Sequence, residues 1–194
     1  SLFQRNINPL TTDKLTQKNV GGGPRFFDFQ VAAPKSVSVM SMFDESLAEV
    51  HTESVRIAMR ELECLAAVRV RDGENARTNN YETTGKLVYA EFTHDTSRAL
   101  DPQLHTHNVV CNVTKTADGK YKALESLEMV RAIPYAGKVY HNEMAAKCRE
   151  LGYETVETRD RKGNIVWYDL KGVSGEIMER FSKRRIQIEK AEAE

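Results

Sequence analysis

The chain has 194 residues, of which 40% are hydrophobic and 29% are charged, and its formal net charge is zero. This composition is typical of a soluble globular domain, and it excludes a protein that coats nucleic acid through net charge alone. No apolar run approaches the roughly 18 residues that a membrane-spanning helix requires, so we expect no membrane insertion. The neutral total hides an uneven distribution, because residues 1–43 carry five basic and two acidic side chains whereas residues 44–66 carry two and six.

The cysteines indicate a reducing compartment. Cys64, Cys111 and Cys148 are odd in number, far apart and without a CxxC motif. We therefore expect reduced cysteines that pack as small apolar side chains. The first ten residues, SLFQRNINPL, contain no basic-then-apolar secretion signal.

The first 43 residues predict a loop, a strand and a turn. Residues 1–24 are rich in Asn, Gly, Pro and Thr turn signals. The strand follows at 25–31, and an acidic residue, Asp28, lies in its middle. Such an acid is either a satisfied structural group or a functional one. Residues 33–38 predict a turn that contains Lys35.

A long helix is predicted next, from an N-cap at Asp44 to about Ala66. His51 lies in this helix beside acidic residues, and we interpret it as a solvent-exposed side chain. A short strand at 67–71 and a polar loop at 73–81 complete this part of the chain.

The second half predicts strands that alternate with helices. The expected elements are strands at 86–94 and 104–114, a hairpin turn at Asp118-Gly119 into a strand at 121–124, a helix between Pro134 and Gly152, a hairpin of strands 154–158 and 165–170, and a last helix capped by Ser174. This pattern predicts an α+β fold in which helices pack on an antiparallel sheet.

Three of the five histidines gather on two successive predicted strands. His105 and His107 are two residues apart, so a strand directs both imidazoles to one face. His94 ends the preceding strand, and all three can converge if the two strands are antiparallel neighbours. Three imidazoles can bind a divalent metal ion and leave coordination positions open for water or a phosphate oxygen. Alternatively, they are strand-end histidines that bond to neighbours such as Asp95.

A cupin barrel also uses an HxH motif, but it would need a glutamate shortly after the second histidine and many more short strands. Here the residues after His107 are Asn-Val-Val-Cys-Asn. We therefore disfavour the cupin interpretation.

Four stretches resemble the MobF-class conjugative relaxases, the TrwC/TraI type of HUH endonuclease. They are FDFQVAAPKSVSV (27–39), TTGKLVYAEFTHDTSR (83–98), DPQLHTHNVVCNVT (101–114) and ERFSKRRIQIE (179–189). They span nearly the whole chain in the family's order. The resemblance implies an HUH-endonuclease palm and site-specific nicking of one strand at a plasmid transfer origin through a phosphotyrosine.

The resemblance also implies roles for six residues. The metal ligands would be His94, His105 and His107. Asp28 would be the catalytic carboxylate, which assists the tyrosine or orients a metal histidine. Arg98 and Lys35 would contact DNA phosphates. The implied cofactor is a divalent ion such as Mg, Mn or Zn, because imidazoles accept several metals.

The implied partner is single-stranded DNA at the transfer origin, together with conjugation accessory proteins and a type IV secretion system. The implied location is the bacterial cytoplasm.

One departure from the family pattern concerns the nucleophile. The family's nucleophilic tyrosines precede the FDF strand, but the 27 residues before Asp28 contain no tyrosine. We therefore expect residues 1–194 to be a partial relaxase domain, lacking the nucleophile segment and the helicase domain, and unable to nick by itself. Two alternatives remain, namely an HUH replication initiator and a non-catalytic module that binds single-stranded DNA.

Overall fold

The computed structural model describes residues 7, 11–12, 24–70 and 80–193. The chain forms two compact units. The first comprises Ser1–Phe29, Met59–Glu91 and His107–Ala136, and the second comprises Gln30–Ala58, Phe92–Thr106 and Gly137–Glu194. The helices are α2 (Lys35–Met40), α3 (Ser46–Glu63), α4 (Leu127–Arg131), α5 (Ile133–Glu150), α6 (Gly175–Arg180) and α7 (Lys183–Ala193). The strands are β1 (Phe26–Ala32), β2 (Ala67–Val70), β3 (Asn80–Thr83), β4 (Tyr89–Thr96), β5 (Pro102–Cys111), β6 (Thr114–Lys115), β7 (Tyr121–Lys122), β8 (Thr155–Arg159) and β9 (Ile165–Leu170).

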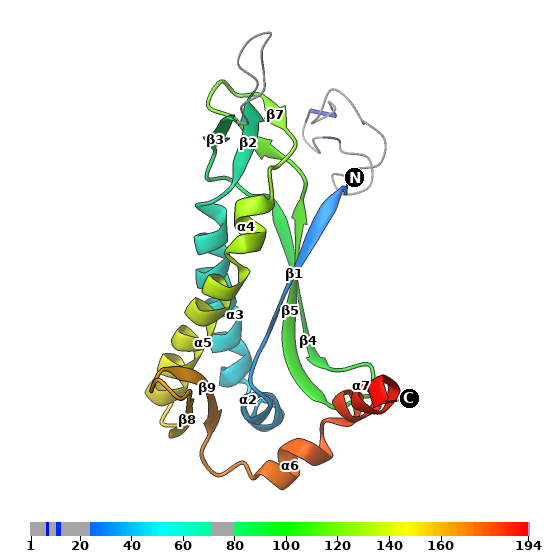
Figure 1. Ribbon diagram of the computed structural model, residues 1–194, viewed down its shortest axis with the longest axis vertical. Coiled ribbons are helices and arrows are strands. Elements are labelled where there is room, and N and C mark those ends of the chain that lie inside the picture. Colours follow the sequence, from blue (N-terminus) through cyan, green and yellow to red (C-terminus); the bar gives the residue numbers. More distant parts are fainter. Residues whose placement is uncertain (1–6, 8–10, 13–23, 71–79, 194) are drawn as a thin grey trace. The chain divides into compact units, whose positions relative to one another are not determined.

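The main sheet has three strands in the order β1-β5-β4 (Figure 1). The strand that carries both HxH histidines, β5, is therefore the central one. Antiparallel pairs are formed by β2 with β3, β6 with β7, and β8 with β9. The predicted α+β fold is confirmed.

The two faces of β5 differ in burial, because side chains alternate along a strand. Leu104, Thr106, Asn108 and Val110 are at most 1% exposed. On the other face His107 and its neighbour Val109 are only half-buried. The histidine face is thus the more open face of the central strand.

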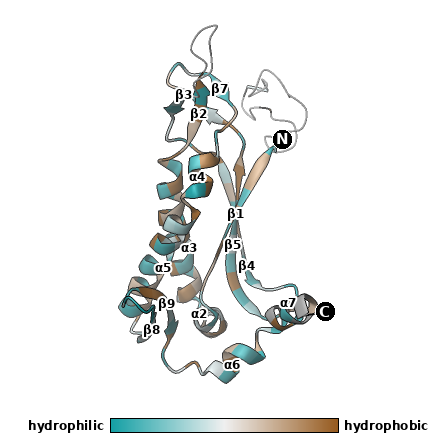
Figure 2. Cartoon of the chain, viewed as in Figure 1, coloured by the Kyte–Doolittle hydropathy of each residue, from teal (hydrophilic) through white to brown (hydrophobic). Residues whose placement is uncertain are grey.

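The helices α3 and α5 are amphipathic, and apolar and polar stretches alternate around each of them (Figure 2). The fully buried residues of the second unit include Leu47 on α3 and Tyr140, Met144 and Cys148 on α5. Tyr140, Met144 and Cys148 are four residues apart, so they form one buried stripe along α5. Within the described residues, no helix combines the length and the apolar character needed to cross a membrane.

Several predicted boundaries were wrong. Residues 35–40 form a helix rather than a turn, because Ser36 is buried and its hydroxyl donates to Asp169 Oδ1 and accepts from the Leu170 amide. The last helix is interrupted between α6 and α7. Its predicted cap is confirmed, since the Ser174 side chain accepts from the Ile177 amide. The strand β3 begins inside the predicted polar loop, of which residues 73–79 lie outside the described part of the chain.

Candidate metal and nucleic-acid site

The second unit brings His94 and His105 together. Their ring centroids are 5.4 Å apart, with an interplanar angle of 33°. His94 lies on β4 with an exposed side chain, whereas His105 on β5 is 8% exposed. The Nδ1 atom of His105 is 2.8 Å from the Gln103 carbonyl oxygen. A carbonyl can only accept, so Nδ1 carries the proton and the lone pair of the neutral ring lies on Nε2.

The first unit brings His107 and Asp28 together. The Nδ1 atom of His107 is 2.7 Å from Asp28 Oδ2, and the two side chains are 32% and 47% exposed. A carboxylate accepts this hydrogen bond, so the neutral His107 ring also has its lone pair on Nε2. Asp28 therefore contacts one of the histidines that the resemblance makes a metal ligand, and its role as the catalytic carboxylate stays a prediction.

These contacts fit metal ligation, because metal-binding histidines almost always donate their second ring N–H to a carboxylate or a backbone carbonyl. His105 and His107 both follow that pattern. The described residues nevertheless contain no assembled group of three or more His, Cys, Asp or Glu side chains that could hold an ion. His94 lies beside His105 in the second unit, and His107 lies beside Asp28 in the first. The three-histidine centre stays a prediction.

The two basic residues that the sequence indicated as phosphate contacts have different surroundings. Arg98 is exposed, in the turn between β4 and β5. The Lys35 amine donates to two backbone carbonyls, Pro102 O at 2.8 Å and Phe181 O at 3.0 Å. A phosphate contact by Lys35 would compete with these bonds. Its role in DNA binding stays a prediction, as does that of Arg98.

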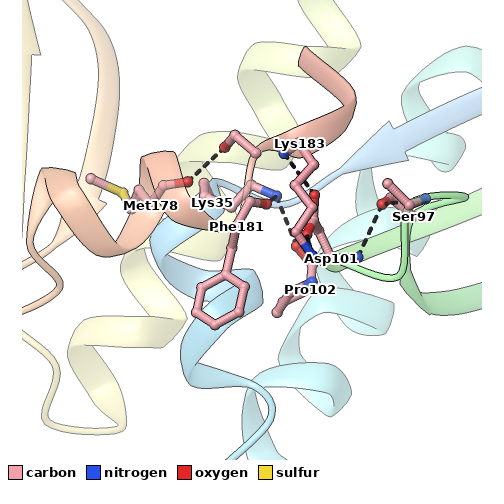
Figure 3. A network of polar contacts seen from close by, with 9 residues as sticks. Lys35, Ser97, Asp101, Pro102, Met178, Phe181 and Lys183 are labelled. Carbon is pink, nitrogen blue, oxygen red and sulfur yellow. Dashed lines mark hydrogen bonds and ion pairs between the residues drawn. The ribbon is translucent and has the colours of Figure 1, made fainter. Parts of the chain in front are cut away.

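The sequence analysis missed Asp101, which joins the turn before β5 to the start of α7 (Figure 3). Its side chain is only 2% exposed, and its Oδ2 accepts the Lys183 backbone N–H at 2.7 Å. The Lys183 amine forms an ion pair with Oδ1 at 3.3 Å. Asp101 thus acts as an N-cap for a helix that is remote in sequence. The only local signal is an Asp-Pro pair directly ahead of the HxH strand.

The interpretation of His51 as solvent-exposed was wrong. The side chain is fully buried, with Nδ1 2.6 Å from the Tyr140 hydroxyl and Nε2 2.9 Å from Thr106 Oγ1. Burial, with a smaller contribution from the charge of His105, lowers the pKa of His51 to about 4. The imidazole is therefore neutral at physiological pH.

Four tyrosines have surroundings that disfavour the phenolate. Burial raises the pKa of Tyr140 and of Tyr168. A hydrogen bond to Asp44 raises the pKa of Tyr153 to about 12, and one to Glu61 raises the pKa of Tyr135. None of the four is activated as a nucleophile by these contacts. Tyr81 on β3 is 49% exposed.

The three cysteines are free thiols, but Cys64 is exposed, so the prediction that all three pack as small apolar side chains was wrong for Cys64. Cys111 and Cys148 are buried, and burial raises the pKa of the Cys148 thiol to about 11.

Known proteins resemble the chain over most of its length. The multifunctional conjugation protein TraI of Escherichia coli is 41% identical over 180 residues, which cover 87% of this chain and 10% of TraI. A metal-bound structure of conjugative relaxase TrwC in complex with oriT DNA matches with a TM-score of 0.83 at 33% identity, over 95% of this chain and 63% of that one. A copper-bound structure of TrwC in complex with oriT DNA matches with a TM-score of 0.79 at 35% identity, over 90% of this chain and 57% of the TrwC chain.

The chain therefore spans about a tenth of TraI and about three fifths of the solved TrwC chains. A sequence model of the TrwC relaxase family matches residues 1–194. The match covers the whole chain, and the solved relatives share its fold at more than 30% identity. The chain belongs to the TrwC relaxase family, as its four sequence stretches predicted.

Proposed function

We propose that this chain is the metal-binding core of a conjugative relaxase, which nicks one DNA strand at a plasmid transfer origin and carries out strand transfer. The observation that carries the proposal is the orientation of the HxH histidines. The Nδ1 atom of each is held by an acceptor, Asp28 for His107 and the Gln103 carbonyl for His105. Both Nε2 lone pairs can therefore serve as ligands on one face of β5.

In this proposal His94, His105 and His107 hold a divalent ion. The bound ion would polarise the scissile phosphate and stabilise the charge that develops on its oxygens. Asp28 keeps His107 in the ligating tautomer, and Arg98 contacts a phosphate from its exposed turn. The ion is Mg, Mn or Zn in our expectation, and the copper-bound TrwC structure adds copper as an ion that a relative accepts.

The attacking group in this reaction is a tyrosine. A free tyrosine has a pKa near 10, so it needs a base or a cation nearby at neutral pH. The contacts of Tyr135 and Tyr153 with carboxylates have the opposite effect. We therefore propose that the chain alone forms no covalent adduct with DNA.

We propose single-stranded transfer-origin DNA as the substrate, conjugation accessory proteins and a type IV secretion system as partners, and the bacterial cytoplasm as the location. The support is the family membership and the relatives, TraI and the oriT-bound TrwC.

Calorimetry with Mn²⁺ tests the metal site. The wild-type chain should bind one ion, and a His105→Ala/His107→Ala variant should lose the binding heat. A matched control is His141→Gln, because the ring contacts of His141 are with Tyr140, Trp167 and Tyr168, none of which lies on β4 or β5. Circular dichroism verifies that each variant is folded. Unchanged Mn²⁺ affinity in the double variant would refute the proposed site.

A second candidate function, binding of single-stranded DNA without cleavage, is favoured by the tyrosine surroundings. Fluorescence anisotropy with a labelled transfer-origin strand should give an affinity that falls with salt, because phosphate contacts release counterions. Arg98→Ala should reduce the salt slope by about one. Lys171→Ala, which removes an exposed lysine paired with Glu154, should leave the slope unchanged. A covalent adduct at Tyr81 or Tyr135 on a denaturing gel would instead show that the chain nicks.

A further inference from the structure

Thr106 is the residue between the two HxH histidines, and its side chain lies on the buried face of β5. It is 1% exposed, and its hydroxyl is 2.9 Å from His51 Nε2. The same hydroxyl is 2.9 Å from Thr93 Oγ1 on β4. Thr93 directly precedes His94 in the sequence. The two threonines therefore adjoin all three candidate ligands from the opposite face of their strands.

The network continues behind the sheet in the second unit. His51 on α3 contacts Thr106 through one ring nitrogen and the Tyr140 hydroxyl on α5 through the other, at 2.6 Å. His51 and Tyr140 are both fully buried. A broken bond here would leave a polar group without water, which costs more than an ordinary hydrogen bond gains. The contacts are therefore stiff.

The direction of the hydrogen bonds follows from proton counting. Among the described residues, the Tyr140 hydroxyl is bonded only to His51 Nδ1. If His51 Nδ1 carried the proton, the buried phenol proton would have no acceptor. The neutral ring therefore accepts from Tyr140 at Nδ1 and donates from Nε2–H to Thr106 Oγ1. The Thr106 hydroxyl then donates to Thr93 Oγ1. Each buried donor in this chain of bonds has an acceptor, and the exposed Thr93 hydroxyl can donate to solvent.

We propose that His51 is a positioning residue for the metal site, which acts through Thr106 and Thr93 to fix the register and orientation of β5 against β4. The inference rests on the proposed function, because it deals with the same histidines. His51 does not contact the ion. It keeps the strand segments that bear His94 and His105 from sliding or twisting relative to each other. The fixed spacing of the imidazoles then preorganises them for one coordination geometry.

The effect reaches the ligands through the backbone, because Thr106 is bonded to His105 and His107 and Thr93 is bonded to His94. A strand residue and its neighbour point to opposite faces, so a rotation of Thr106 also turns His105 and His107. Supporting groups around a metal site typically change its affinity by about 10–100-fold. We expect the lower end of that range, because the network acts through the backbone.

The test is a Co²⁺ titration that is monitored both by calorimetry and by the visible absorption of the bound ion. His51→Phe and Thr106→Val should raise the Co²⁺ dissociation constant about tenfold and alter the absorption spectrum. His51→Gln should restore most of the affinity, because a glutamine amide also offers one acceptor and one donor direction. The control Ser54→Ala removes a fully buried hydroxyl from α3, the helix that carries His51, and should bind as the wild type does.

The imidazole nitrogens of His51 can also be observed directly by ¹⁵N NMR in the metal-free chain. The expected spectrum shows a protonated Nε2 and an unprotonated Nδ1. A protonated Nδ1 would overturn the assigned hydrogen-bond direction.

The outcomes separate the inference from the proposed function. If the wild-type chain does not bind Co²⁺, both fail. If the wild type binds and folded Thr106→Val has the wild-type dissociation constant and spectrum, the positioning role is wrong and the metal site stands. Thr106→Val is nearly isosteric, so it keeps the test decisive even if His51→Phe does not fold.

Discussion

Asp28→Asn should weaken metal binding by about fivefold. The substitution keeps an oxygen that can accept the His107 Nδ1–H but removes the carboxylate charge from a 2.7 Å contact. Charge-assisted hydrogen bonds are roughly twice as strong as neutral ones, which amounts to a difference of about 1–1.5 kcal/mol. The two side chains are 47% and 32% exposed, so solvent screening limits the effect to the lower part of that range. A free-energy difference of about 1 kcal/mol corresponds to a change in affinity of about fivefold.

The assay is calorimetric titration with Mn²⁺ at fixed ionic strength. Asp28→Ala should bind more weakly than Asp28→Asn, because it also loses the acceptor. Asp118→Asn is the matched control, since it removes an equally exposed carboxylate, 53% exposed, from an ion pair with Lys120 in the same unit. An equal loss of affinity in Asp118→Asn would show that net charge, not the orientation of His107, determines binding. Wild-type affinity in Asp28→Asn would refute the role of Asp28 altogether.

Two further predictions concern stability. The pKa of His51 falls from 6.5 to about 4 on folding, so the unfolded chain takes up the proton first, and the free energy of unfolding should drop by up to about 3 kcal/mol as the pH falls from 6.5 to 4. Urea titrations at several pH values should show this loss in the wild type and a smaller one in His51→Phe, whereas equal losses would contradict the assignment. Asp101→Ala should lower the free energy of unfolding by about 2 kcal/mol, because the Lys183 N–H loses a buried acceptor. Lys183→Met removes only a 61% exposed ammonium and should lower the free energy of unfolding by less than about 1 kcal/mol. Equal losses in Asp101→Ala and Lys183→Met would argue against the capping role of Asp101.

Local chemistry made much of the fold predictable. The alternation of side chains on strands placed Asp28 on β1 and the histidines on β4 and β5, within a few residues of their observed bounds. Turn and cap signals were equally local, as the confirmed Ser174 cap illustrates. The motifs themselves were specific enough to indicate the family.

Helix boundaries near tertiary contacts were not predictable in this way. The α2 segment appears as a Pro-Lys-Ser turn in the sequence, but burial of Ser36 against β9 stabilises it as a helix. The break before α7 is stabilised by Asp101, which lies 82 residues earlier in the chain. No sequence window of ordinary length contains both partners of such a contact.

The sequence by itself determined that His105 and His107 share a face and that an acid lies on a nearby strand. Their spacing follows from the period of a strand, which is a property of the backbone. Only the tertiary structure decided which acceptor holds each Nδ1 atom, and that Asp28 pairs with His107. It also decided that His51 is a buried member of a polar network rather than a surface residue. A helical residue lies in the core or in solvent according to what packs against its face, and in this chain the packing partners of His51 are Thr106 and Tyr140, 55 and 89 residues away.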